Sequence, residues 1–167
     1  MHSIVRTVIA SCMVVAVSAC AQATPTPQAA AVERNQSNQS AVITTTSTEQ
    51  MEQLLKSQGY AYTIDEDGDL VWMHDGYKSI VLISREKNNL MFKAVFTDGG
   101  GNLETVNQWN QNVRYSRSYM SDDGDTVLEL DLDLDGGVTE QHVIEWLKVC
   151  RDSFRMWIAD VVLAEQV

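Results

Sequence analysis

The sequence predicts an α+β fold in which an antiparallel sheet packs against helices. Runs rich in aromatic and β-branched residues gather between residues 60 and 96, and Asp-Gly pairs at 67–68, 75–76 and 98–99 mark turns around them. The segment 143–161 instead carries apolar residues at helical spacing. Because strand and helix signals are segregated along the chain, we expect helices packed on one sheet.

The first half of the domain is predicted to be a helix followed by a meander. Ser47 stands three residues before Gln50, as in a capping box, apolar residues follow at helical spacing, and Gly59 is a stop signal. Short apolar runs separated by turn residues follow, and such runs are typical of strands. The predicted strands are 60–64, 70–74, 77–84 and 90–96.

The second half is predicted to be a helix, a hairpin and a long helix. Residues 103–113 have the spacing of a short helix, and 114–120 and 126–135 are predicted strands joined through Asp123-Gly124. Thr139 is the expected N-cap of the last helix. Its apolar arc consists of Val143, Trp146, Leu147, Cys150, Phe154, Trp157, Ile158 and Val161. The order is therefore helix, three or four strands, helix, hairpin, helix.

Residues 1–19 are predicted to be a secretory signal peptide. A short n-region with Arg6 precedes an uncharged apolar run that is too short to span a bilayer. Residues 17–20, Val-Ser-Ala-Cys, resemble a bacterial lipobox and predict lipid attachment at Cys20; ordinary cleavage a few residues further on is the alternative. Since Ala21 follows the cysteine, the resemblance implies the outer membrane, on its periplasmic side.

Residues 20–46 are predicted to be a disordered tether, because they hold both prolines and few large apolar side chains. The domain is then expected at 47–163. Cleavage before Cys20 removes one of the 12 Lys and Arg and none of the 23 Asp and Glu, so the mature net charge is −12. Such a surface repels phosphate backbones and anionic lipids. Nucleic acid is excluded as a partner, and membrane contact is expected only through the anchor at Cys20.

Residues 131–142 begin like an EF-hand calcium loop. Asp131, Asp133 and Asp135 alternate and Gly136 follows, but His142 stands where a bidentate Glu is required. Alternating leucines and acids from Glu129 onward indicate a strand with one exposed acidic face. We therefore predict no metal site, and weak cation binding by strand 129–135 stays open as an alternative.

Two segments resemble a known family. They are "GYAYTIDEDGDLVW" and "VNQWNQNVRYSRSYMSDDGDTVLELDLDLDGGVT", and the resemblance to YbjN-type proteins, called bacterial sensory transduction regulators, extends over about residues 48–158. It implies the fold of type III secretion chaperones, which are small, acidic, often dimeric and bind polypeptides without catalysis. A protein or peptide partner is thus implied, and a homodimer is left open.

No catalytic residue and no cofactor is predicted. Cys150 lies in the centre of the apolar arc, so we expect a buried small hydrophobe rather than a nucleophile. His74, before a turn, and His142, at a helix start, are expected on the surface.

Two groups of residues are candidates for partner binding. Lys148, Arg151 and Arg155 share one flank of the last helix and could hold an acidic partner, although pairing with Glu145 and Asp152 is the favoured interpretation. The second group places two amide side chains beside an aromatic ring, a combination that is useful in binding. The alternative interpretation is that the ring is simply part of the core. This second group consists of Asn107, Trp109 and Asn110.

These observations predict a non-enzymatic interaction module, tethered to the envelope through Cys20, that binds a protein or peptide. One alternative is an enzyme of unknown reaction whose residues converge only in three dimensions. The other is a weak cation sensor that uses the acidic strand.

Overall fold

The computed structural model describes residues 41–97 and 99–164 of the chain. The predicted signal peptide 1–19, the lipid attachment site at Cys20 and the tether up to residue 40 lie outside the described residues. Among the described helices, none is long and apolar enough to cross a bilayer.

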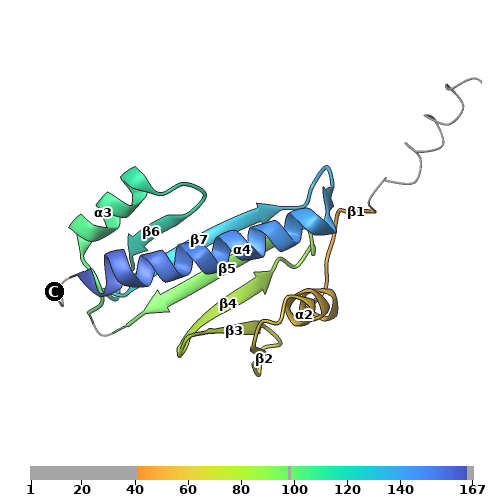
Figure 1. Cartoon of the computed structure of the whole chain (residues 1–167), viewed down its shortest axis with the longest axis horizontal. Helices are drawn as coiled ribbons and strands as arrows, with labels where there is room; N and C mark the ends of the chain where they lie inside the picture. Colours follow the sequence, from red (N-terminus) through yellow and green to blue (C-terminus); the bar gives the residue numbers. More distant parts are fainter. Residues whose placement is uncertain (1–40, 98, 165–167) are drawn as a thin grey trace, which may run out of the picture. The chain divides into compact units, whose positions relative to one another are not determined.

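Six strands form one antiparallel sheet in the order β2-β3-β4-β5-β7-β6. The first four form the predicted meander and the last two the predicted hairpin (Figure 1). Their bounds are β2 Tyr62–Ile64, β3 Leu70–His74, β4 Tyr77–Ile83, β5 Asn89–Phe96, β6 Arg117–Met120 and β7 Thr126–Asp133. The α+β prediction and the order of elements are confirmed.

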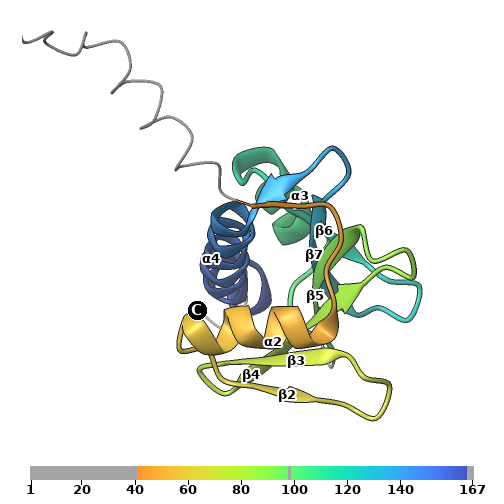
Figure 2. The ribbon, with the colours of Figure 1, turned by 90° about the vertical axis from the view of Figure 1, so that its right-hand side faces the viewer.

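In the part of the chain that the structure describes, three helices accompany the sheet. They are α2 (Thr48–Ser57), α3 (Leu103–Asn112) and α4 (Glu140–Trp157), and α4 is continued by a π-helical turn η1 (Ile158–Val162). Figure 2 shows the sheet curving around α4 and α2, which lie on the same side of it. The predicted caps form, because the Ser47 side chain accepts from the Gln50 backbone N–H and the Thr139 side chain accepts from that of His142.

The core lies between α4 and the concave face of the sheet. Leucine, phenylalanine and tryptophan side chains from alternate strand positions meet the apolar arc of α4 there. Its largest fully buried members include Trp72, Phe92, Leu128, Leu147 and Trp157. The predicted alternation of β7 is confirmed, since its leucines face this core.

The structured region starts before Ser47, where the tether was predicted to end. A short strand β1 (Val42–Ile43) pairs antiparallel with β8 (Val138–Thr139). Gly137 has a φ of 90° and a Cβ there would collide with Val42, so the absence of a side chain permits the close approach. Thr46 is buried and its N–H donates to the Lys87 carbonyl at 2.8 Å.

Strand β6 begins three residues later than predicted. Tyr115 has a φ of 65°, in the left-handed region that few side chains favour, and the chain turns away from the sheet there. Trp109 Nε1 donates to Ser116 Oγ at 3.1 Å and holds this turn against α3. The outer side of β7 therefore has a strand partner only from Thr126 to Glu129.

Candidate functional site

The acidic face of β7 is not uniformly exposed as predicted, because Glu129 is only 3% exposed. Arg117 Nε donates to its Oε2 at 2.8 Å and Tyr119 Oη to its Oε1 at 2.9 Å, while Lys93 Nζ lies 3.2 Å from Oε1. Burial by itself would raise the pKa of Glu129, but these three donors outweigh it and hold the pKa below its usual value. Glu129 is thus a buried, compensated charge.

The remaining acids of this face, Asp131, Asp133 and Asp135, are exposed. Asp133 accepts from the Asp135 backbone N–H at 2.8 Å, and Asp135 accepts from Asn88 Nδ2 at 3.0 Å, so both shape the turn after β7. Within residues 41–97 and 99–164, no three His, Cys, Asp or Glu side chains are grouped so that they could hold a metal ion.

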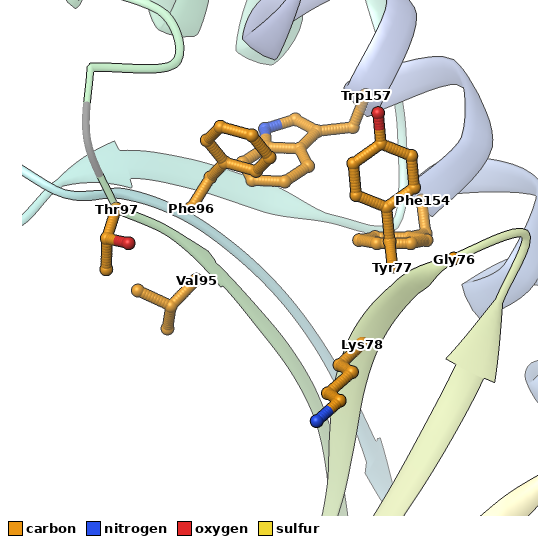
Figure 3. A pocket seen from close by; sticks show the side chains of 8 residues that line it. All are labelled: Gly76, Tyr77, Lys78, Val95, Phe96, Thr97, Phe154 and Trp157. Atoms are coloured by element: carbon orange, nitrogen blue, oxygen red, sulfur yellow. The ribbon is translucent and has the colours of Figure 1, made fainter.

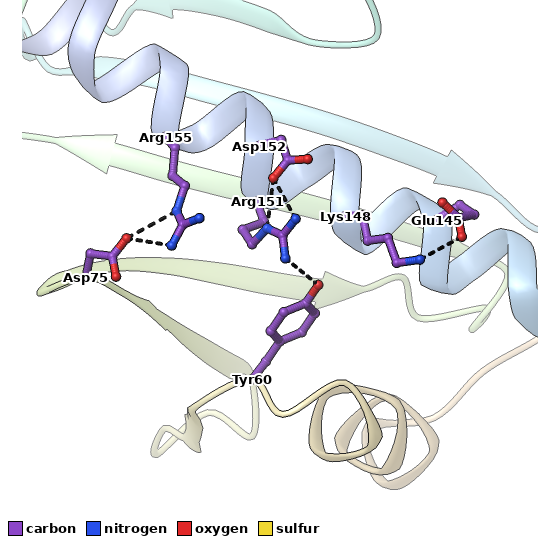
Figure 4. Close-up of polar contacts among 7 residues, drawn as sticks. All are labelled: Tyr60, Asp75, Glu145, Lys148, Arg151, Asp152 and Arg155. Carbon is purple, nitrogen blue, oxygen red and sulfur yellow. Dashed lines mark hydrogen bonds and ion pairs between the residues drawn. The ribbon is translucent and has the colours of Figure 1, made fainter.

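The cationic flank of α4 is engaged in ion pairs within the domain (Figure 4). Lys148 pairs with Glu145 and Arg151 with Asp152, each at 2.8 Å, as the favoured interpretation had it. Arg151 also donates to the Tyr60 hydroxyl at 3.3 Å. Arg155 pairs instead with Asp75, in the turn between β3 and β4, at 2.8 Å. The first two pairs lie within α4, and only the contacts of Arg151 with Tyr60 and of Arg155 with Asp75 link the helix to the first half of the domain.

The residues Asn107, Trp109 and Asn110 of α3 have different environments in the structure. Trp109 is buried. Asn110 bridges to β6, because its Nδ2 donates to the Ser118 carbonyl at 2.8 Å and its Oδ1 accepts from the Ser118 N–H at 2.9 Å. Asn107 is exposed. Both asparagines are exposed, but the Trp109 ring is buried, so the three residues do not form one exposed surface.

His74 is buried, and its predicted surface position is wrong. It is 6% exposed, its ring lies 4.3 Å from that of Trp72 and 4.8 Å from that of Phe154, and Nε2 is 2.8 Å from Ser79 Oγ. Burial, with Arg155 nearby, lowers the pKa of His74 to about 4. The side chain is neutral at pH 7 and belongs to an aromatic cluster of the core.

The other two predictions on titratable side chains are confirmed. Cys150 is fully buried and burial raises the pKa of its thiol well above the usual value, which makes it a poor nucleophile. His142 is exposed at the start of α4.

A notch opens where β4 and β5 separate. The pairing of β4 with β5 ends at Ile80 and Lys93, yet β4 continues to pair with β3 as far as Tyr77, and β5 with β7 as far as Phe96. Residues 77–79 and 94–96 therefore each have a strand neighbour on one side only. Two open strand edges face each other across the notch, as Figure 3 shows.

Aromatic side chains line the notch, which has a volume of about 400 Å³. Tyr77 and Phe96 come from the two edges, with ring centroids 6.2 Å apart, while Phe154 and Trp157 come from α4 (Figure 3). Val95, which is 45% exposed, and Lys78 lie at the rim. The notch therefore combines aromatic rings with the backbone donors and acceptors of two open strand edges. Sequence reasoning missed it, although Tyr77 and Phe96 stand at the ends of two predicted strands.

The fold and this site define a small α+β sheet-and-helix protein whose open hollow is aromatic and bounded by strand edges. The YbjN family model, described as "Putative bacterial sensory transduction regulator", matches residues 47–162, and the chain belongs to this family. The resemblance predicted from the sequence is thereby confirmed.

Two solved structures resemble this fold. One is described as "YbjN, a putative transcription regulator from E. coli"; it has a TM-score of 0.57 and 14% identity, covering 75% of this chain and 95% of that one. The second is the Yersinia pestis type III secretion chaperone SycH in complex with a stable fragment of YscM2, with a TM-score of 0.43 and 14% identity over 60% of this chain and 90% of that one. No curated protein matches.

Proposed function

We propose that this protein is a non-enzymatic interaction module, tethered to the cell envelope, that binds an extended stretch of polypeptide in the notch between β4 and β5. The observation that carries the proposal is the pair of open strand edges on either side of an aromatic hollow. An extended chain binds such an edge through main-chain hydrogen bonds and gains specificity from pockets for alternate side chains.

The composition of the notch favours binding over catalysis. Four of its eight described lining residues are aromatic, and none of these eight is a histidine, cysteine or carboxylic acid. An apolar side chain of the partner would cover Tyr77 and Phe96, while its backbone would pair with residue 78 or 95. The partner is therefore a peptide with at least one large apolar residue.

The tether follows from the sequence features that precede the domain. Residues 17–20 resemble a lipobox and residues 20–40 provide a polar, proline-containing spacer, so the domain would reach its partner from the periplasmic side of the outer membrane. The intact mass of the membrane-extracted protein checks this. We expect an acylated chain beginning at Cys20, lost in Cys20→Ser; an unmodified chain beginning near Gln22 would remove the anchor from the proposal.

The binding site is tested with short linear peptides selected from a random displayed library on the soluble mature chain with Cys20→Ser. Val95→Asp places a carboxylate at the rim and should weaken binding roughly tenfold or more. Ile64→Asp, on another strand and 41% exposed, is the matched control and should leave binding unchanged. Equal affinities for both variants would contradict the proposed site.

A further inference from the structure

The second half of β7 has an open outer edge. Strand β6 pairs with β7 only as far as Arg117 opposite Glu129, because the chain leaves the sheet at Tyr115. Residues 130–133 pair with β5 alone on their inner side. The Leu134 N–H donates to Asn88 on that inner side. Since backbone groups alternate along a strand, those of Asp131 and Asp133 point to the outer edge.

An apolar hollow of about 450 Å³ lies beside this edge. Leu132 of β7 and Trp146 and Val149 of α4 form its walls, and Tyr115, which is 79% exposed, stands at the end next to β6. The rim carries the carboxylates of Asp131 and Glu145 together with His142, and no Lys or Arg is among the described residues that line the hollow. Arg117, on the neighbouring strand, is engaged by Glu129.

Trp146 supplies a second, independent observation. It is only 8% exposed and lines the hollow, and its Nε1–H is the one buried side-chain donor in the described part of the chain with no hydrogen-bond partner. Buried polar groups are almost always paired, and an indole N–H can only donate. The nitrogen itself is buried in this structure, so a peptide carbonyl would satisfy it once the indole shifts toward the hollow on binding.

We propose that an extended, basic polypeptide adds to the sheet along Asp131–Asp133, in the place that β6 vacates at Tyr115. Its backbone pairs with the open edge and an apolar side chain enters the hollow beside Trp146. Its Lys or Arg side chains lie by Asp131 and Glu145. This site lies on the outer edge of β7, away from the notch, and does not depend on the proposed function.

A second copy of this chain fits the edge less well than a basic polypeptide. Two copies pairing through this edge would bring Asp131 and Asp133 of one against the same carboxylates of the other, and like charges placed opposite each other oppose association. The net charge of −11 for the whole chain acts in the same direction. Charge complementarity therefore selects a cationic partner.

The probe is a synthetic peptide that alternates Lys with Val or Leu, titrated calorimetrically into the mature chain with Cys20→Ser. Asp131→Asn should raise the Kd about fivefold, whereas Asp122→Asn, an exposed acid in the turn between β6 and β7, should leave it unchanged. A peptide that is N-methylated at alternate amides keeps its charge but cannot pair with a strand edge, and should bind at least about tenfold more weakly.

Three results would overturn this inference. Equal binding of the methylated peptide would indicate attraction by charge alone. Equal Kd values for the two Asp variants would place the peptide elsewhere. Sedimentation could instead show a dimer whose stability changes in Asp131→Asn and which the peptide does not dissociate. That result would assign the edge to a second copy of the chain. Val95→Asp should not change the binding of this peptide, which separates this site from the notch.

Discussion

The two faces of the sheet each bury one titratable side chain, with opposite outcomes. On the covered face, His74 is 6% exposed among aromatic rings and is neutral at pH 7. On the open face, Glu129 is 3% exposed and charged, because Arg117, Tyr119 and Lys93 surround it. The two side chains are about equally buried but have opposite charge states, because the neighbouring side chains determine whether the charged form is stabilised. The helices α4 and α2 pack against the covered face. The strand edges that lack a neighbour, on β4, β5 and β7, are the places where a partner could bind.

The largest effect is expected from acidification, and it should arise from His74. The unfolded chain takes up this proton below about 6.5, whereas the folded chain does so only below about 4. Stability is therefore fully present above pH 6.5 and falls by about 3 kcal/mol as the pH drops to 4. Urea unfolding at several pH values measures this, and His74→Gln should flatten the slope; an unchanged slope would contradict a buried neutral imidazole.

The open face should respond to loss of its buried carboxylate. Glu129→Ala leaves Arg117, Tyr119 and Lys93 without their acceptor and should cost about 2 to 3 kcal/mol of unfolding free energy. Asp131→Ala, two residues along the same strand and exposed, should change it by less than about 0.5 kcal/mol. Similar losses for both, in denaturant melts at pH 7, would break the distinction between the two positions.

The pH dependence of the open face should run in a different window. The folded pKa of Glu129 lies below its usual value, so its contribution is present above the unfolded value of 4.5 and is lost as the pH falls through the folded pKa. Glu129→Gln should therefore lower stability above pH 4.5, and the difference from the parent protein should shrink as the pH falls below 4.5. A changed slope between pH 5 and 6.5 in that variant would show that His74 and Glu129 are coupled.

The smallest effects are expected on the flank of α4. Arg155→Ala and Lys148→Ala remove exposed ion pairs with Asp75 and Glu145, and each should cost at most about 1 kcal/mol. High salt should remove most of this difference. A loss of several kcal/mol in thermal unfolding would mean that this flank, rather than the core face of α4, holds the helix in place.

The sequence predicted the elements because their signals are local. Caps at Ser47 and Thr139, the leucines of β7 and the arc of α4 depend on spacing over a few residues. Pairing of Lys148 with Glu145 was predictable for the same reason, whereas Arg155 reaches Asp75, 80 residues earlier in the chain. Local spacing also does not reveal that Phe154 of α4 packs on His74 of β3 and buries it.

The candidate sites were harder to predict, because each depends on where pairing stops. The alternation in β4 and β5 fixes which side chains share a face, but not that β4 is unpaired with β5 before Ile80. The acids of β7 are equivalent in the sequence pattern. In the structure, the left-handed turn at Tyr115 shortens β6, so Glu129 has a strand neighbour on its outer side and Asp131 does not. Strand ends, rather than strand interiors, carry the proposed binding sites.

The most direct test of the central claim, polypeptide binding in the notch, is to follow the backbone amide resonances of the mature Cys20→Ser chain while a library-selected peptide is added. The account predicts that the largest shifts fall on Tyr77–Ser79 and Ala94–Phe96, the two open edges, and that Val95→Asp abolishes them. Shifts confined to other elements, or shifts that persist in Val95→Asp, would contradict it.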